Sequence, residues 1–154
     1  MKQFIIQTAW LGLLVLTCML AGCKTTDAAH SGSLASVIVS GHTAEEIQQT
    51  TIDIFGWNGY ARVTDLIFEK QGSKWDSMNY GSLGGKPVWI KMCVTLTTKG
   101  PGWYVLGCDA YVVDGHGEGF METEQKLKFA KADDCKKILD QIKQRLSLQP
   151  AKSS

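Results

Sequence analysis

The sequence has no excess of charge of either sign. Its 154 residues include 16 lysines and arginines and 15 aspartates and glutamates. Residues 1–22 contain one charged side chain, Lys2, so the rest of the chain has 15 basic and 15 acidic residues. A neutral chain without a basic cluster argues against nucleic-acid binding and against docking to acidic polymers.

The chain also lacks the short motifs of several enzyme classes. It has no Gly-x-Ser-x-Gly sequence, which marks one class of serine hydrolase, and no Cys-x-x-Cys pair, which marks many redox proteins. Its paired carboxylates, Glu45-Glu46 and Asp133-Asp134, stand where helical patterns begin, and there they favour the helix dipole. The sequence therefore predicts a protein that is not an enzyme.

Residues 1–22 have the three parts of an export signal. Lys2 supplies the positive start, residues 9–20 form an apolar run, and two small residues precede a cysteine. The sequence Leu20-Ala21-Gly22-Cys23 resembles the lipobox of bacterial lipoproteins, in which the cysteine is lipidated and becomes the first residue of the mature protein. The alternative is an uncleaved transmembrane helix over residues 4–21.

The lipobox resemblance implies attachment to a membrane of the cell envelope through a lipid on Cys23. In enteric-type lipoproteins, Asp directly after that cysteine retains the protein in the inner membrane, and here the residue is Lys24. For a Gram-negative cell the resemblance therefore implies the outer membrane, with the protein facing the periplasm.

Composition divides the chain into four segments. Residues 1–22 are the expected signal peptide, and the small polar residues 23–36 are the expected lipid-anchored tether. Residues 37–148 are long enough for one domain, and residues 149–154 form a polar tail.

The residue pattern of the domain predicts an α+β fold. The expected elements are a strand at 37–39, a helix from the Thr43 capping box to Gly56, a β-rich segment at 60–70 divided at 64–65, a long loop at 71–87, strands at 88–98 and 103–113, an edge strand at 120–129, and a final helix capped by Asp133 or Asp134. This order predicts an antiparallel sheet of four to five strands with an N-terminal and a C-terminal helix packed on one face. It resembles the helix-grip domains of small periplasmic lipoproteins, over residues 37–148 and in element order only.

Three cysteines, Cys93, Cys108 and Cys135, remain in the expected domain, and they allow at most one internal disulfide. If strands 88–98 and 103–113 align their apolar faces, Cys108 points to the core, as Cys135 does from the last helix. That register favours a Cys108–Cys135 bond. A different register places Cys93 opposite Cys108 and favours that pair, and buried unpaired thiols are the third possibility.

The segment Asp114–Gly119 places Asp114, His116 and Glu118 at alternate positions, as at the start of a calcium-binding loop. However, imidazole is a poor ligand for a hard cation, and the twelfth position is Gln125 rather than Glu. We therefore predict an exposed glycine-rich turn without metal or cofactor. The three side chains remain candidate ligands for the alternative, a metal or small-ligand site.

The sequence as a whole predicts a membrane-anchored envelope protein that acts as a non-catalytic binding or scaffold module. Its expected partner is another envelope protein. Trp89 and Trp103, which share one face of the predicted hairpin, and the loop at 71–87 are the candidate contact surfaces. The alternatives are a lipoprotein that binds a small ligand or metal through Asp114–Gly119, and an envelope hydrolase, against which the missing motifs argue.

Overall fold

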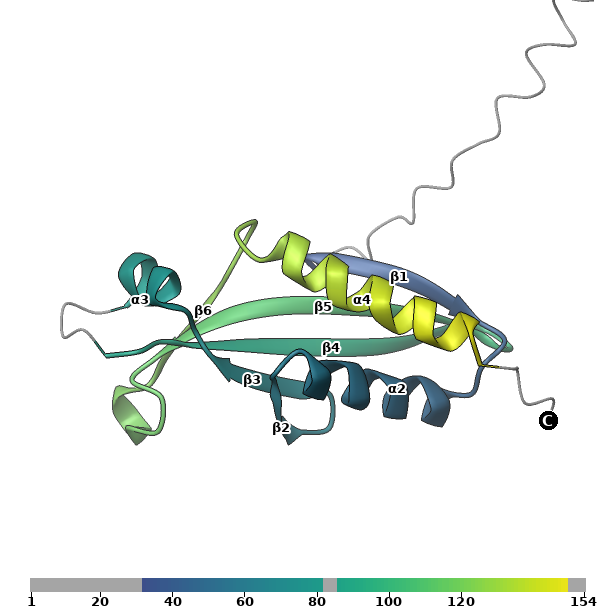
Figure 1. The fold of residues 1–154 in the computed structure, drawn as a ribbon, viewed down its shortest axis with the longest axis horizontal. Coiled ribbons are helices and arrows are strands. Elements are labelled where there is room, and N and C mark those ends of the chain that lie inside the picture. Colours follow the sequence, from purple (N-terminus) through teal and green to yellow (C-terminus); the bar gives the residue numbers. More distant parts are fainter. Residues whose placement is uncertain (1–31, 82–85, 150–154) are drawn as a thin grey trace, which may run out of the picture.

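The computed structural model describes residues 32–81 and 86–149 (Figure 1). In chain order its elements are β1 (Ala35–Ser40), α2 (Ala44–Trp57), β2 (Ala61–Thr64), β3 (Ile67–Gln71), α3 (Lys74–Tyr80), β4 (Trp89–Gly100), β5 (Trp103–Asp114), the 3₁₀ turn η1 (Gly119–Met121), β6 (Thr123–Lys126) and α4 (Ala132–Ser147). The strands form one antiparallel sheet in the order β1-β5-β4-β3-β2, and β6 also pairs with β5. The predicted lipobox and most of the predicted tail lie outside the described residues.

The long β4–β5 hairpin forms the centre of the sheet, and its register aligns the apolar positions of the two strands. Ile90 pairs with Val112, and Val94 pairs with Cys108. These four side chains are buried on the face that the helices cover. The predicted face-matched register is therefore confirmed. The register that would place Cys93 opposite Cys108 is wrong, because Cys93 pairs with Asp109.

Helix α2 begins at the predicted capping box. The hydroxyl of Thr43 accepts a hydrogen bond from the Glu46 N–H at 3.2 Å, and the Glu46 carboxylate accepts one from the Thr43 N–H at 3.1 Å. The predicted stop at Gly56 is wrong, because the helix continues to Trp57. The residue that takes the left-handed conformation after the helix is Gly59, with φ 80°.

Helix α4 packs with α2 over the same face of the sheet. Its buried stripe is the predicted one, with these members: Cys135, Ile138, Leu139, Ile142 and Leu146. The prediction that Asp133 or Asp134 caps the helix is wrong, because the N-cap position is Lys131, whose side chain makes no cap hydrogen bond. Both carboxylates lie in the first turn, where they complement the helix dipole.

The segment between β3 and β4 differs most from expectation. The predicted loop at 71–87 is wrong for residues 74–80, which form α3. A second capping box starts this helix: the Ser73 hydroxyl accepts from the Asp76 N–H at 3.1 Å, and the Asp76 carboxylate accepts from the Ser73 N–H at 2.8 Å. These two bonds satisfy backbone groups that a short helix otherwise leaves unpaired.

Two element boundaries also differ from expectation. The predicted edge strand at 120–129 is shorter, because residues 119–121 form η1 and only residues 123–126 pair with β5. Strand β1 begins at Ala35, two residues before the predicted start of the domain, so Ala35 and Ser36 belong to the sheet and not to the tether. The α+β class, with its antiparallel sheet and two terminal helices on one face, is confirmed. No helix among the described residues is both long and apolar enough to span a bilayer.

An aromatic cluster joins α2 to the sheet. The Phe55 ring stacks on Phe68 of β3 with 4.1 Å between ring centroids, and it meets Tyr60 edge-on at 5.5 Å. Phe55 is 0% exposed and Phe68 is 1% exposed. Burial of two large rings in direct contact makes this cluster a main source of stability for the packing of α2 on the sheet.

We predict that Phe55→Ala lowers the free energy of unfolding by about 3–5 kcal/mol, because it opens a large cavity beside Phe68. Urea unfolding followed by circular dichroism measures the change. Trp57→Ala is the matched control, since Trp57 lies on the same helix but is 68% exposed. The cost of this control is expected to stay below about 1 kcal/mol. Equal losses in the two variants would contradict the role given to the cluster.

Candidate binding groove

One edge of β4 extends past the strand that pairs with it. Strand β3 pairs with β4 over Trp89–Cys93, and a further bond joins the Val94 N–H to the Leu66 carbonyl at 2.9 Å. Beyond Val94, as far as Gly100, no other part of residues 32–81 and 86–149 pairs with this edge of β4. Backbone groups point alternately to the two edges of a strand, so those of Leu96 and Thr98 share the open side with Val94. They form a short row of unpaired donors and acceptors, which is the arrangement that another extended chain can continue.

A groove of about 360 Å³ lies at this open edge, between α2, the β2–β3 turn and β4. The residues that line it are Gln48, Ile52, Arg62, Asp65, Leu66, Ile67, Val94 and Leu96. We call it the α2–β4 groove. Five of these eight side chains are aliphatic, and Leu66, Leu96 and Ile52 pack against the core from its edge. The groove therefore combines aliphatic side chains, polar side chains and a free strand edge.

The β2–β3 turn forms one wall of the groove. Asp65 has φ 33°, the left-handed conformation that Asp adopts more readily than most residues. Its carbonyl accepts a hydrogen bond from Nε of Arg62 at 2.8 Å. This contact across the turn holds the Arg62 side chain at the wall of the groove.

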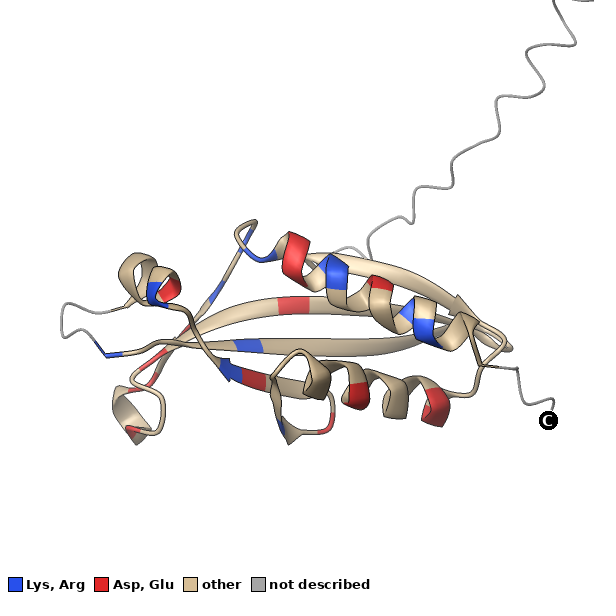
Figure 2. Cartoon of the chain, in the orientation of Figure 1, with Lys and Arg blue, Asp and Glu red and all other residues tan. Residues whose placement is uncertain are grey.

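The charged side chains of α2 are all acidic, although the two residues of α2 that line the groove, Gln48 and Ile52, are uncharged. Helix α2 contains Glu45, Glu46 and Asp53 and no lysine or arginine (Figure 2). Gln48 and Ile52 line the groove, and Glu45 lies one turn before Gln48 on the same face of the helix. Glu45 is not one of the lining residues, and it lies beyond them toward the start of α2.

Residue patterns alone do not predict this groove. The signal that could have indicated it is a difference in length, because β3 has 5 residues and its neighbour β4 has 12. A long strand beside a short one leaves an open edge unless another segment covers the difference. That comparison needs the pairing of β3 with β4, which residue patterns alone do not give.

The glycine-rich loop after β5 is tied to the sheet through His116. Its ring stacks on Trp89 with 4.3 Å between centroids, and Nε2 lies 2.9 Å from a carboxylate oxygen of Glu69 on β3. The loop therefore folds back over the outer face of the sheet, which is the face away from the helices. His116 serves there as a packing and hydrogen-bonding group.

The other two candidate ligands of this loop have different neighbours. Asp114 accepts a hydrogen bond from the Gly115 N–H at 3.0 Å, and Glu118 makes an ion pair with Lys86. Within the described ranges, no group of three or more histidine, cysteine, aspartate or glutamate side chains is arranged to hold a metal ion. The structure thus places the three residues in one loop without bringing their side chains together around one centre.

The two tryptophans expected to form a contact surface are far apart along the sheet. Both lie on its outer face, but Trp89 begins β4 beside Val113, whereas Trp103 begins β5 beside Gly100 at the other end of the hairpin. Trp89 is half-buried under His116, and Trp103 is 56% exposed. The two side chains therefore do not form a single patch.

The structure brings Cys108 and Cys135 into contact in the core. Their sulfur atoms are 3.2 Å apart, and both residues are 0% exposed. A disulfide bond is about 2.05 Å long, so the two thiols are adjacent but not bonded. The contact with Cys135 and burial raise the pKa of the Cys108 thiol. Cys93 lies on the outer face, away from this pair, and burial raises the pKa of its thiol as well.

Comparisons with family models, with curated proteins and with solved structures find no match to this chain.

We predict that Cys108 and Cys135 form a disulfide when the protein is isolated from an oxidising compartment without reductant. Trypsin then releases residues 100–126 and 132–136 as one linked peptide, which separates into two after reduction. Mass spectrometry of the non-reduced digest measures this directly. Recovery of Cys108 as a free thiol would rule out the bond.

Proposed function

We propose that this chain is a lipid-anchored envelope lipoprotein whose domain is a non-catalytic binding module for a partner protein. The anchor is a lipid on Cys23, and in a Gram-negative cell the protein belongs to the outer membrane and faces the periplasm. Support for the anchor comes from the apolar export segment followed by Leu20-Ala21-Gly22-Cys23. The proposed partners do not include nucleic acid.

The observation that carries the binding function is the open edge of β4 inside the α2–β4 groove. A partner segment in extended conformation can pair with the backbone of Leu96 and Thr98, and main-chain hydrogen bonds of this kind supply affinity in strand addition. The aliphatic lining beside the edge accepts alternate side chains of such a segment. Together these features fit a peptide strand better than a compact small molecule.

The groove also indicates what kind of segment it accepts. Side chains that point toward α2 meet Ile52, Val94 and Leu96, which favours apolar residues at every second position. Glu45, one helical turn before Gln48 of the lining, favours a basic residue at the end of the segment that lies toward the start of α2. The proposed ligand is therefore an extended segment that alternates apolar and polar residues and carries lysine or arginine near one end.

The two alternatives gain no comparable support from the geometry. A metal or small ligand at Asp114–Gly119 lacks a converging set of side chains, because Asp114, His116 and Glu118 have separate partners. For a hydrolase, no observation in the described residues suggests a nucleophile with an adjacent base. We therefore propose the binding function and neither alternative.

We predict that a photo-crosslinking residue at Thr98, in the native lipoprotein in cells, captures a specific envelope protein. The test variant carries Leu96→Pro in addition to the crosslinking residue, and proline removes the backbone N–H of residue 96. This N–H points to the open edge and bonds to no other described residue, so the β4–β5 ladder keeps its hydrogen bonds. Capture is expected to fall several-fold, in line with about 0.5–1.5 kcal/mol for each lost hydrogen bond.

Leu96→Val is the matched control, because it retains the N–H and a similar apolar side chain, and it is expected to leave capture unchanged. Circular dichroism confirms that each variant is folded. Equal capture by the proline and valine variants would place the partner elsewhere on the domain. Absence of any captured protein would contradict the binding function itself.

A further inference from the structure

Two exposed aromatic side chains, on separate parts of the chain, each directly follow an exposed lysine. Trp75 follows Lys74 in α3 and is 66% exposed, and Phe129 follows Lys128 in the turn before α4 and is 87% exposed. Met78, one turn after Trp75 on the same side of α3, is 79% exposed. We call these five side chains the Trp75–Phe129 surface. Large exposed apolar side chains that gather on one part of a surface often mark a site of interaction with a protein or a membrane.

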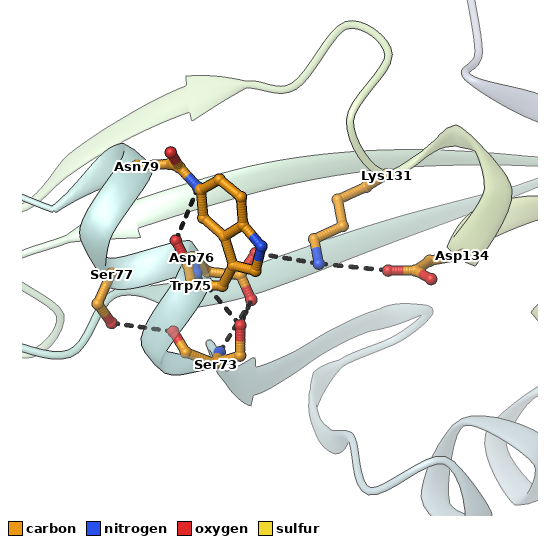
Figure 3. A network of polar contacts seen from close by, with 7 residues as sticks. All are labelled: Ser73, Trp75, Asp76, Ser77, Asn79, Lys131 and Asp134. Atoms are coloured by element: carbon orange, nitrogen blue, oxygen red, sulfur yellow. Dashed lines mark hydrogen bonds and ion pairs between the residues drawn. The ribbon is translucent and has the colours of Figure 1, made fainter.

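The two parts of this surface are held next to each other by an ion pair. Lys131, two residues after Phe129, places its Nζ 3.0 Å from a carboxylate oxygen of Asp76, the residue after Trp75 (Figure 3). The same Nζ lies 3.3 Å from Asp134 in the first turn of α4. The bridge joins α3 to the start of α4, so the two lysine–aromatic pairs lie on segments that are in contact through Asp76 and Lys131. Figure 1 shows α3 near one end of the sheet and the turn before α4 on the side of α3 that faces the middle of the sheet.

The ion pair between Asp76 and Lys131 remains charged at neutral pH. Burial opposes the charge on Asp76, but hydrogen bonds from Ser73 and Lys131 outweigh burial and lower the pKa of its carboxyl below the ordinary value. An acid with a lowered pKa stays ionised above its ordinary value, and its contribution is lost only as the pH falls through the lowered one. The link between α3 and the α4 turn is therefore present throughout the neutral range.

The charge of the surface is positive where the aromatic residues are exposed. Among the described residues, Lys74 and Lys128 have no acidic partner, whereas Lys131 is neutralised by Asp76 and Asp134. An exposed lysine beside an exposed aromatic ring matches the interface of a bilayer with anionic lipids. There the ring enters the headgroup region, and the ammonium group stays with the phosphates.

We propose that the Trp75–Phe129 surface lies against the anionic surface of the membrane that carries the anchor. This inference rests on the proposed lipid anchoring at Cys23. Eight residues, 24–31, separate Cys23 from Gly32, where the described domain begins. This stretch spans at most about 30 Å, so an anchored domain stays within reach of the bilayer. A domain that is attached both through acyl chains and through an interfacial patch also has a fixed orientation on the lipid surface.

The chemistry favours lipid over a protein partner at this surface. A protein interface gains from a buried centre with few charged residues, whereas here each exposed ring directly follows an exposed lysine in the sequence. The apolar groups also stand on two separate projecting segments, which suits a fluid headgroup layer that adapts to each of them. The α2–β4 groove is lined by other residues, so lipid contact leaves it available to a partner.

The test uses the lipidated protein reconstituted into vesicles of phosphatidylethanolamine and phosphatidylglycerol with brominated acyl chains. Bromine quenches the fluorescence of tryptophans that lie in the bilayer interface. Wild-type protein is expected to lose part of its emission relative to vesicles without bromine, and Trp75→Phe is expected to abolish that quenched component. Trp103→Phe is the matched control, because Trp103 is similarly exposed at the far end of the β4–β5 hairpin, and it is expected to retain the quenched component.

Two further arms test the charge and the anchor. Replacing phosphatidylglycerol by phosphatidylcholine, or changing Lys74 and Lys128 to glutamine, is expected to reduce the Trp75 component. The proposal is overturned if wild-type protein shows no quenching, or if Trp75→Phe is quenched as strongly as wild type. Capture of another protein by a photo-crosslinker at residue 75 overturns it as well. The intact mass of the same sample reports the lipid on Cys23. A protein without that lipid contradicts the proposed anchoring separately from the quenching result.

Discussion

The pairing of β4 with β5 is the constraint on which the other features of the fold depend. Their register places Ile90, Val94 and Cys108 on one face, and this face becomes the floor on which α2 and α4 pack. A shift of one residue would turn each of these side chains toward water, so burial of the apolar face selects the register. The same register directs Cys108 toward Cys135 and sends Cys93 to the opposite face.

The length of this hairpin also creates the proposed binding site. Strand β5 has partners along both of its edges, since β1 and β6 share the edge that β4 does not occupy. Strand β4 has only the short β3 on its other edge, and past Val94 its backbone meets the α2–β4 groove. Natural sheets usually cover or interrupt such an edge, because an open one invites pairing with another chain. Here the edge lies beside an aliphatic lining and an acidic helix, which restricts what can pair with it.

Residue patterns predicted the parts of the fold that depend on local chemistry or on periodicity. The alternation at 88–98 and 103–113 gave the hairpin and its faces, the Thr43–Glu46 spacing gave the start of α2, and the stripe through Leu139 gave α4. Helix α3 was missed because it is short and lies in a segment rich in serine and glycine. Its local signal, the Ser73–Asp76 capping box, was nevertheless present. The groove and the bridge between Asp76 and Lys131 depend on segments that are distant in sequence, and no single-segment pattern contains that information.

The central claim is that β4 has an edge left open for a partner strand, and site-resolved amide hydrogen exchange tests it most directly. In the isolated lipoprotein we expect slow exchange at Met92 and Val94, which bond within the sheet, and fast exchange at Leu96 and Thr98. On binding of the captured partner, Leu96 and Thr98 are expected to become protected while Met92 changes little. Slow exchange at Leu96 and Thr98 in the isolated protein would show that this edge is already occupied and would contradict the account.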